Sequence, residues 1–310
     1  MNQIRRRTLR DYLGLTLRGM LIGSADIVPG VSGGSMAFIL GIYDELIDAV
    51  RAVVPFLKNL FRLRWREAFQ CLPWGFVLSI GLGVGLAVLS MARFLHWALE
   101  EHPEYIFALF FGLIVASIFI VGKRLSRWSP SNLIASALAA LAAFLLIGLA
   151  PASTPHTPFY IFLSGAIAIP ALILPGVSGA FILVLLGKYQ FLLGVLLALD
   201  LVALGIFMFG AATGLVTFSN ILRWLLDHYH NLTVAVLIGF MIGALRKVWP
   251  WKEYERISED LVREINILPA DMTLEIWAAL GLMVLGMIAI ITVDRIATRG
   301  HLDFEKTTSH

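Results

Sequence analysis

Long apolar stretches alternate with short charged segments along most of the chain. A helix needs about 20 mainly apolar residues to cross the hydrocarbon core of a membrane. On this basis we expect transmembrane helices at residues 74–94, 105–122, 132–150, 201–220, 232–247 and 273–293. Two further apolar segments, 12–48 and 159–197, are interrupted by proline and glycine, and the limbs on either side are short for full spans. Each is predicted to be a re-entrant helical hairpin.

Both interruptions carry the same motif. The sequence PGVSG occurs at residues 29–33 and again at 175–179. Further along, Gly41 and Tyr43 match Gly187 and Tyr189 at the same offset. Proline removes a backbone donor, and serine can cap a new helix. We therefore expect a broken helix inside the membrane at both places, where protein or a water-filled cavity must surround the backbone.

The duplication extends beyond the hairpins. Residues 94–112 resemble residues 221–239 at a smaller offset, and the shortfall in the second half is accounted for by segment 51–73, which that half lacks. This pattern predicts two repeats, residues 1–150 and 151–310, each made of one hairpin and three spans. Because three is an odd number of crossings, the repeats should have inverted topologies, as in many transporters.

Composition supports a membrane protein. The chain is 59% hydrophobic and 15% charged, with a net charge of +3, whereas a soluble domain has roughly 25% charged residues. The expected fold class is therefore an all-α polytopic membrane protein. Basic residues near both ends place both termini in the cytoplasm under the positive-inside rule. The positive charge is attributed to these cytoplasmic segments, so no nucleic-acid partner is expected. Cys71 is the only cysteine, which excludes an intrachain disulfide and a cysteine-based metal cluster.

Residues 51–73 stand out among the loops because basic and apolar side chains are interleaved there. A basic amphipathic segment of this kind is expected to lie on the anionic cytoplasmic leaflet. Two interpretations stay open. The segment could collect lipid head groups, or it could be a connector whose long side chains reach from the apolar layer to water.

The breaks also indicate chemistry. After each break a helix begins, and its first amides lack intrahelical partners and carry partial positive charge. In an inverted pair the two helix ends approach each other near the membrane midplane, so the predicted cargo is an anion, with phosphate the natural candidate. The alternative is that the glycines only permit close helix packing. The predicted phosphate-binding positions are Ser32, Gly33, Gly34 and Ser35 in the first repeat and Ser178 and Gly179 in the second.

Charged residues inside apolar segments are costly and mark functional sites by default. Arg18 is assigned as a phosphate clamp and Asp26 as a proton-sensitive or coupling carboxylate, with mutual neutralisation as the alternative. Lys188 is expected to attract an anionic head group from outside, or else to anchor the chain at the interface. Further candidates are Asp44 and Glu45 for coupling, and Tyr43 and Tyr189 as lining residues.

The hairpin sequences resemble a known family. RGMLIGSADIVPGVSGGSMAFILGIYDELI (18–47) and LPGVSGAFILVLLGKY (174–189) are similar to the bacterial polyprenyl-phosphate transporter family, and the resemblance covers essentially the whole chain. It implies a flippase of the bacterial plasma membrane that returns undecaprenyl phosphate, the carrier lipid of cell-wall synthesis, from the outer to the inner leaflet. The implied partners are a polyprenyl phosphate and a coupling ion, either protons or sodium; a homodimer is also considered.

Two other functions stay open on the sequence. HExxH, P-loop and GxSxG motifs are missing from the sequence, so neither an enzyme activity nor a cofactor or metal is expected. An intramembrane undecaprenyl pyrophosphate phosphatase is the first alternative, although Gly33 stands where the PGxSRS motif of that family has arginine. A carrier of small anions is the second.

Overall fold

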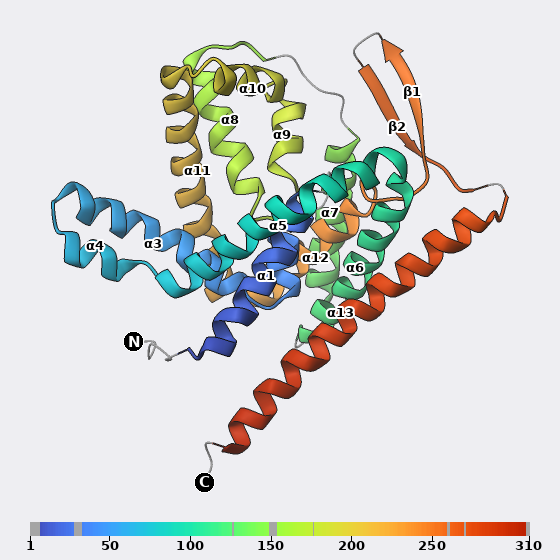
Figure 1. The fold of residues 1–310 in the computed structure, drawn as a ribbon, viewed down its shortest axis with the longest axis horizontal. Coiled ribbons are helices and arrows are strands. Elements are labelled where there is room, and N and C mark those ends of the chain that lie inside the picture. The colour runs from blue at the N-terminus through green and yellow to red at the C-terminus, as the bar shows by residue number, and fades with distance from the viewer. Residues whose placement is uncertain are drawn as a thin grey trace. The chain divides into compact units, whose positions relative to one another are not determined.

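The computed structural model describes residues 7–27, 33–125, 127–148, 154–175, 177–258, 261–269 and 271–307. Within these ranges the chain is helical apart from one two-stranded sheet (Figure 1). The strands are β1 (Lys252–Ser258) and β2 (Leu261–Asn266). The helices are α1 (Leu9–Ile27), α2 (Gly33–Ile39), α3 (Tyr43–Phe61), α4 (Trp65–Cys71), α5 (Trp74–Glu101), α6 (Pro103–Arg124), α7 (Pro130–Ile147), α8 (Pro158–Ala171), α9 (Gly179–Leu185), α10 (Tyr189–Leu197), α11 (Leu201–His228), α12 (His230–Ala244) and α13 (Leu274–Thr307).

The prediction of a multi-span helical membrane protein is confirmed. Five helices in the described part of the chain, α5, α6, α7, α11 and α13, are long and apolar enough to cross a membrane. Helix α12, which covers most of the predicted span 232–247, is shorter, with 15 residues. Leucine, valine and phenylalanine side chains are exposed along the spans, as lipid contact requires; Leu89 and Phe209 are examples.

Each predicted hairpin consists of two limbs that pack against each other, α1 with α2 and α8 with α9. Helix α8 has 14 residues and α9 has seven, which corresponds to lengths of about 21 and 10 Å. Neither length reaches the ~30 Å of a hydrocarbon core. In Figure 1, α8, α9 and α11 run side by side, and α10 lies across their ends. A pair of helices bent in this way is either a broken span or a re-entrant segment.

The structure contains a second break in each hairpin that the sequence analysis did not foresee. The second limb of the predicted hairpin 12–48 is divided at Gly41 (φ 70°), and its counterpart in the hairpin 159–197 is divided at Gly187 (φ 63°). Positive φ is readily adopted only by glycine, so both residues end one helix and redirect the chain into the next. The bend between α9 and α10 is 108°.

The chain folds into two compact units that draw on both halves of the sequence: Met1–His96 with Pro151–His228, and Trp97–Ala150 with Tyr229–His310. In the first unit, glycines bring helix backbones into direct contact. A Cβ atom on Gly19 of α1 would overlap the carbonyl of Ile80 in α5, and one on Gly165 of α8 would overlap that of Phe207 in α11. Gly19 and Gly165 are equivalent at the offset that separates the two PGVSG motifs, so the same contact is built twice.

The second unit pairs helices from different halves of the sequence. A Cβ on Gly112 of α6 would overlap Met283 of α13, and one on Gly239 of α12 would overlap Ser136 of α7. The last span of each predicted repeat therefore packs against a helix of the other.

The helices of the second half begin at positions given by the two offsets between the halves, one between the PGVSG motifs and a smaller one between residues 94–112 and 221–239. Helices α9 and α10 begin at the residues that the PGVSG offset assigns to the starts of α2 and α3. Helices α11 and α12 begin where the smaller offset places the starts of α5 and α6. Helices α5 and α11 both have 28 residues. The duplication is thus visible in the secondary structure.

The charged segment after α12, for which the sequence analysis predicted no strand, forms the antiparallel hairpin of β1 and β2. Its first residue, Lys252, has a side chain that is only 3% exposed and donates to Glu264 Oε2 at 2.9 Å. Lys247 donates to the other oxygen of Glu264 at 2.8 Å. One carboxylate therefore joins both strands of the hairpin to the segment that leads out of α12.

Candidate functional site

The breaks of the two halves lie against each other in the first unit. A Cβ on Gly34, at the start of α2, would overlap the carbonyl oxygens of Leu172 and Ile173 at the end of α8. The hydroxyl of Tyr43 donates to the carbonyl of the same Ile173 at 3.0 Å, and Tyr43 is only 3% exposed. One corner of the second hairpin is therefore contacted by the start of α2 and by the start of α3.

The first backbone amide of α2 is hydrogen-bonded to a carboxylate. Asp26 Oδ1 accepts a hydrogen bond from the backbone N–H of Gly33 at 2.6 Å. A Cβ on Gly33 would lie 2.6 Å from Oδ2 of the same carboxylate, so a side chain here would displace the carboxyl group of Asp26. Asp26 itself is exposed. The predicted donor Ser32 lies outside the described residues. The helix start predicted to bind an anion thus contacts a carboxyl group of the chain itself.

Arg18 lies on the same helix as Asp26, two turns earlier, about 12 Å along the axis. Its side chain is half-buried, and it forms no hydrogen bond or ion pair with another residue of the described ranges. The two groups flank one stretch of α1 and make no direct contact, and their separate roles as phosphate clamp and coupling carboxylate stay predictions.

The second break is built for close packing. Ser178 caps α9, and its Oγ accepts from the N–H of Phe181 at 3.5 Å. A Cβ on Gly179 would overlap the carbonyl of Ala168 in α8. In the first half, Ser35 is buried within α2. At these three positions the contacts described are those of helix capping and packing.

Lys188 is fully buried, and its ammonium is occupied by protein acceptors. It donates to the carbonyls of Thr154 and Pro155, both at 2.7 Å, and lies 2.9 Å from Nδ1 of His156. An ammonium has three hydrogens, and these neighbours accept all three when Nδ1 is the unprotonated nitrogen of the His156 ring. Lys188 therefore fastens the loop before α8 to the corner between α9 and α10. Tyr189, the next residue, is 38% exposed.

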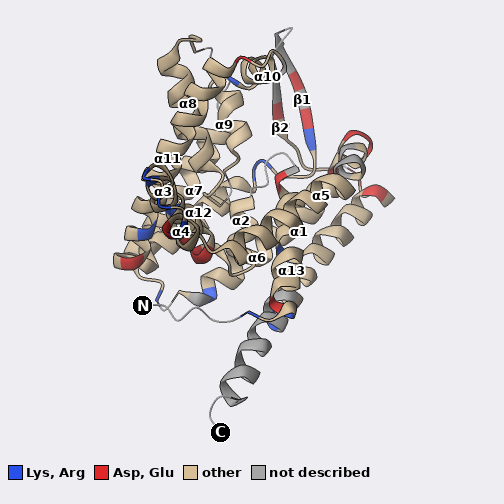
Figure 2. Cartoon of the chain, turned by 60° about the vertical axis from the view of Figure 1, so that its left-hand side comes forward, with Lys and Arg blue, Asp and Glu red and all other residues tan. Residues whose placement is uncertain are grey.

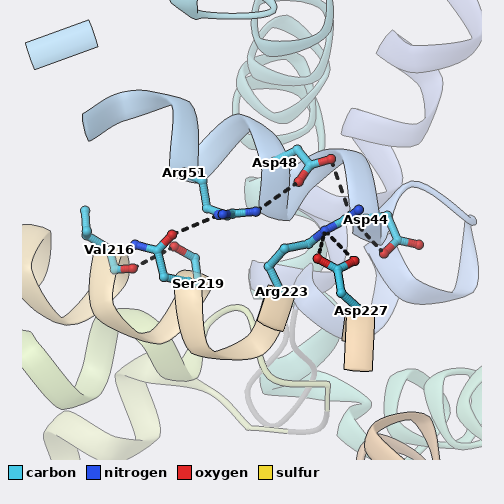
Figure 3. Close-up of polar contacts among 8 residues, drawn as sticks. Asp44, Asp48, Arg51, Val216, Ser219, Arg223 and Asp227 are labelled. Atoms are coloured by element: carbon cyan, nitrogen blue, oxygen red, sulfur yellow. Dashed lines mark hydrogen bonds and ion pairs between the residues drawn. The ribbon is translucent and has the colours of Figure 1, made fainter. Parts of the chain in front are cut away.

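Asp44 belongs to an ion-pair network that joins α3 to α11 (Figure 3). Arg223 lies 3.5 Å from Asp44, 3.6 Å from Asp48 and 3.1 Å from Asp227. Arg51 pairs with Asp48, as the same view shows. Its Nε also donates to the side chain of Asn220 at 2.9 Å. The network was missed from the sequence because α3 and α11 lie in different halves of the chain, and no local pattern connects their charged residues.

Glu45, the other acidic candidate, is separate from this network. It pairs with Arg7, just ahead of α1. Both candidate coupling carboxylates of α3 thus have basic partners within the first unit. In the described residues, no cluster of histidine, cysteine, aspartate or glutamate has the arrangement needed to hold a metal ion.

Comparison with known proteins places this site in context. Residues 22–266 match the undecaprenyl phosphate translocase-like family. The chain is 39% identical over 244 residues to a polyprenyl-phosphate transporter of Vibrio cholerae, covering 78% of this chain and 79% of that protein. A polyprenyl-phosphate transporter of Staphylococcus aureus is 28% identical over 253 residues, covering 76% and 85%. No solved structure matches. The chain therefore belongs to the undecaprenyl phosphate translocase-like family.

Proposed function

We propose that this protein is a flippase that carries undecaprenyl phosphate, or a related polyprenyl phosphate, from the outer to the inner leaflet of the bacterial plasma membrane. Both curated relatives are named as transporters of this lipid class, not as enzymes. The observation that carries the proposal is the meeting of the two breaks, where Gly34 and Tyr43 contact the corner at Ile173. Such a junction of interrupted helices is where transporters bind their cargo.

The phosphate head group takes the place that Asp26 occupies at the start of α2. The amide of Gly33 already has a carboxylate partner there. Arg18 lies on α1, the helix of Asp26, and has no ion-pair partner among the described residues that it would have to leave in order to bind the phosphate. The need for such a site is electrostatic, because the transfer of an unaided ion into hydrocarbon costs tens of kcal/mol in the Born limit. The polyprenyl tail stays in the bilayer, so only the head group has to be enclosed.

Access to the site alternates because the repeats are inverted, with both termini in the cytoplasm. The residues equivalent to Tyr43 and Ile173 at the PGVSG offset are Tyr189 and Ile27. Tyr43 is buried and makes its hydrogen bond to Ile173, whereas the side chain of Tyr189 is exposed. This asymmetry is what one access state of a two-fold related cycle requires.

Asp26 couples transport to an ion. When it is ionised it competes with the phosphate for the Gly33 amide, and when it is protonated it releases that amide. Protons are the favoured coupling ion for this reason; sodium is the alternative, in which the carboxylate binds the cation.

The test is a leaflet-resolved measurement of undecaprenyl phosphate in proteoliposomes, with and without a pH gradient. Replacing Arg18 by alanine should reduce the rate at least tenfold, because a charge-assisted contact to phosphate is worth about 1.5 to 3 kcal/mol. The Asp26→Asn variant should lose the dependence on the gradient. Arg10→Ala, an exposed position on the same helix, is the matched control and should transport normally. Wild-type rates and gradient dependence in both site variants would contradict the assignment.

A further inference from the structure

A helical hairpin projects from the first half of the chain without a counterpart in the second. Helix α3 has 19 residues and is followed by α4, whereas α10, at the equivalent position, has nine and leads directly into α11. Figure 1 shows α3 and α4 lying side by side. The second half builds its hairpin without this addition. The extension is therefore not needed to complete a repeat, and its surface calls for a separate explanation.

The turn between the two helices carries an unusual surface, which we name the α3–α4 tip (residues 61–66). Apolar and basic residues alternate along it, and all six are exposed. Phe61 is 84% exposed, Leu63 72% and Trp65 55%. The residues between them and after them are Arg62, Arg64 and Arg66. Leu63 also has a positive φ of 56°, a conformation that is strained for a branched side chain.

The hairpin is held in a defined orientation, so the tip is a built surface. Phe69 of α4 stacks on Trp74 at the start of α5 with ring centroids 5.4 Å apart, and Phe56 of α3 packs edge-on against both rings. The indole N–H of Trp74 donates to the carbonyl of Phe69 at 2.7 Å. These contacts fix α3 and α4 to the first span, α5.

The chemistry of the tip selects its partner. Residues 51–71 contain five basic residues and one acidic residue, Glu67, and Figure 2 shows both basic and acidic positions around α3 and α4. Exposed apolar side chains require an apolar environment, at about 25 cal/mol per Å². The arginine guanidinium groups between these apolar side chains require anionic partners, which must lie at the boundary of the apolar environment. An anionic phospholipid leaflet offers both within the thickness of its head-group layer.

We propose that the α3–α4 tip inserts into the anionic leaflet, with Phe61, Leu63 and Trp65 below the phosphates and the three arginines bound to them. Each basic residue near an anionic surface contributes about 1 kcal/mol, so removing three should shift the insertion equilibrium on the order of 100-fold. This proposal concerns the lipid surface and does not depend on the transported substrate.

The experiment uses the full chain with one environment-sensitive fluorophore. Cys71→Ser removes the single cysteine, and Leu63→Cys provides the labelling site. In vesicles of phosphatidylcholine with phosphatidylglycerol, the label should be blue-shifted and protected from iodide, and quenched by lipids with nitroxides near the head group. Protection should weaken in pure phosphatidylcholine, and also in anionic vesicles when Arg62, Arg64 and Arg66 are changed to glutamine.

Leu199 provides the matched control. It also has a positive φ, of 53°, and is 71% exposed, but the nearest charged residue in its turn is Asp200. A label at Leu199→Cys should respond equally in both lipid mixtures. Melting temperatures in detergent that match the parent show that the labelled variants are folded. Equal iodide access at position 63 in both mixtures, with folded protein, would overturn the proposal.

Discussion

At the scale of single residues, two buried lysines show how differently a charge can be kept inside this protein. Lys188 is surrounded by two carbonyls and a histidine nitrogen. Lys252 shares the carboxylate of Glu264 with Lys247. The sequence identified Lys188 as chemically distinctive because charged residues are rare in its neighbourhood. The sequence could not identify the hydrogen-bond partners of Lys188. They belong to the loop before α8, whereas Lys188 follows α9, so the two helices separate them in the sequence.

Replacing Lys188 by methionine should loosen the corner between α9 and α10. The carbonyls of Thr154 and Pro155 would lose their donor, and an unsatisfied buried group costs about 1 to 3 kcal/mol. Hydrogen–deuterium exchange of residues 154–160 should increase, and the melting temperature should fall. Thr154→Val, which removes only the hydroxyl bond to Leu186, should have a smaller effect. A variant of Lys188 that loses transport with unchanged exchange would instead support a direct contact with the head group.

Acid should weaken the β1–β2 hairpin. Partial burial alone would raise the pKa of Glu264, but the ammonium groups of Lys247 and Lys252 outweigh burial and hold that pKa below its ordinary value. The unfolded chain therefore binds the proton more readily, so stability is present above the ordinary glutamate pKa and is lost as the pH falls through the lowered value. Exchange protection of residues 252–266 should decline in that window. Glu264→Gln should be less protected at neutral pH and show no such decline.

At the scale of elements, the sequence predicted the hairpins but not their full shape. Two copies of PGVSG were enough to locate the first break in each, because proline and glycine together interrupt helices. The second breaks, at Gly41 and Gly187, are single glycines in apolar runs, and many such glycines in this chain remain helical. Only the positive φ at these two positions distinguishes them. The strands β1 and β2 were missed because charged residues obscured the alternation expected of strands.

Alanine at either of these glycines should destabilise the protein by about 1 to 2 kcal/mol, the cost of placing a side chain in the left-handed region. Gly41→Ala and Gly187→Ala should have similar effects, since the two positions have the same conformation. Gly81→Ala is the control, because a Cβ at that position of α5 meets no atom within 4 Å and alanine favours helix. The measurement is thermal unfolding in detergent. Equal melting temperatures for all three variants would show that the corners tolerate a side chain.

At the scale of the whole molecule, internal similarity was the most informative feature of the sequence. The two offsets between its halves correctly anticipated where helices recur, down to the starting residues of α9 and α11. The offsets could not reveal that the compact units combine elements from both halves. That arrangement depends on which helices pack against each other at their glycine residues. The sequence around Gly112 of α6 does not indicate whether α7 or α13 packs against it.

The crossed pairing of the last spans has a consequence for biosynthesis. Helix α6 leaves the ribosome early, yet its partner α13 is the final span to be translated, and α7 must wait for α12. Until then the small-residue faces at Gly112 and Ser136 remain open to lipid or to chaperones. A nascent chain that stops before residue 274 would contain every residue of both breaks and still leave α6 without its partner, a state that membrane proteases could recognise as unfinished.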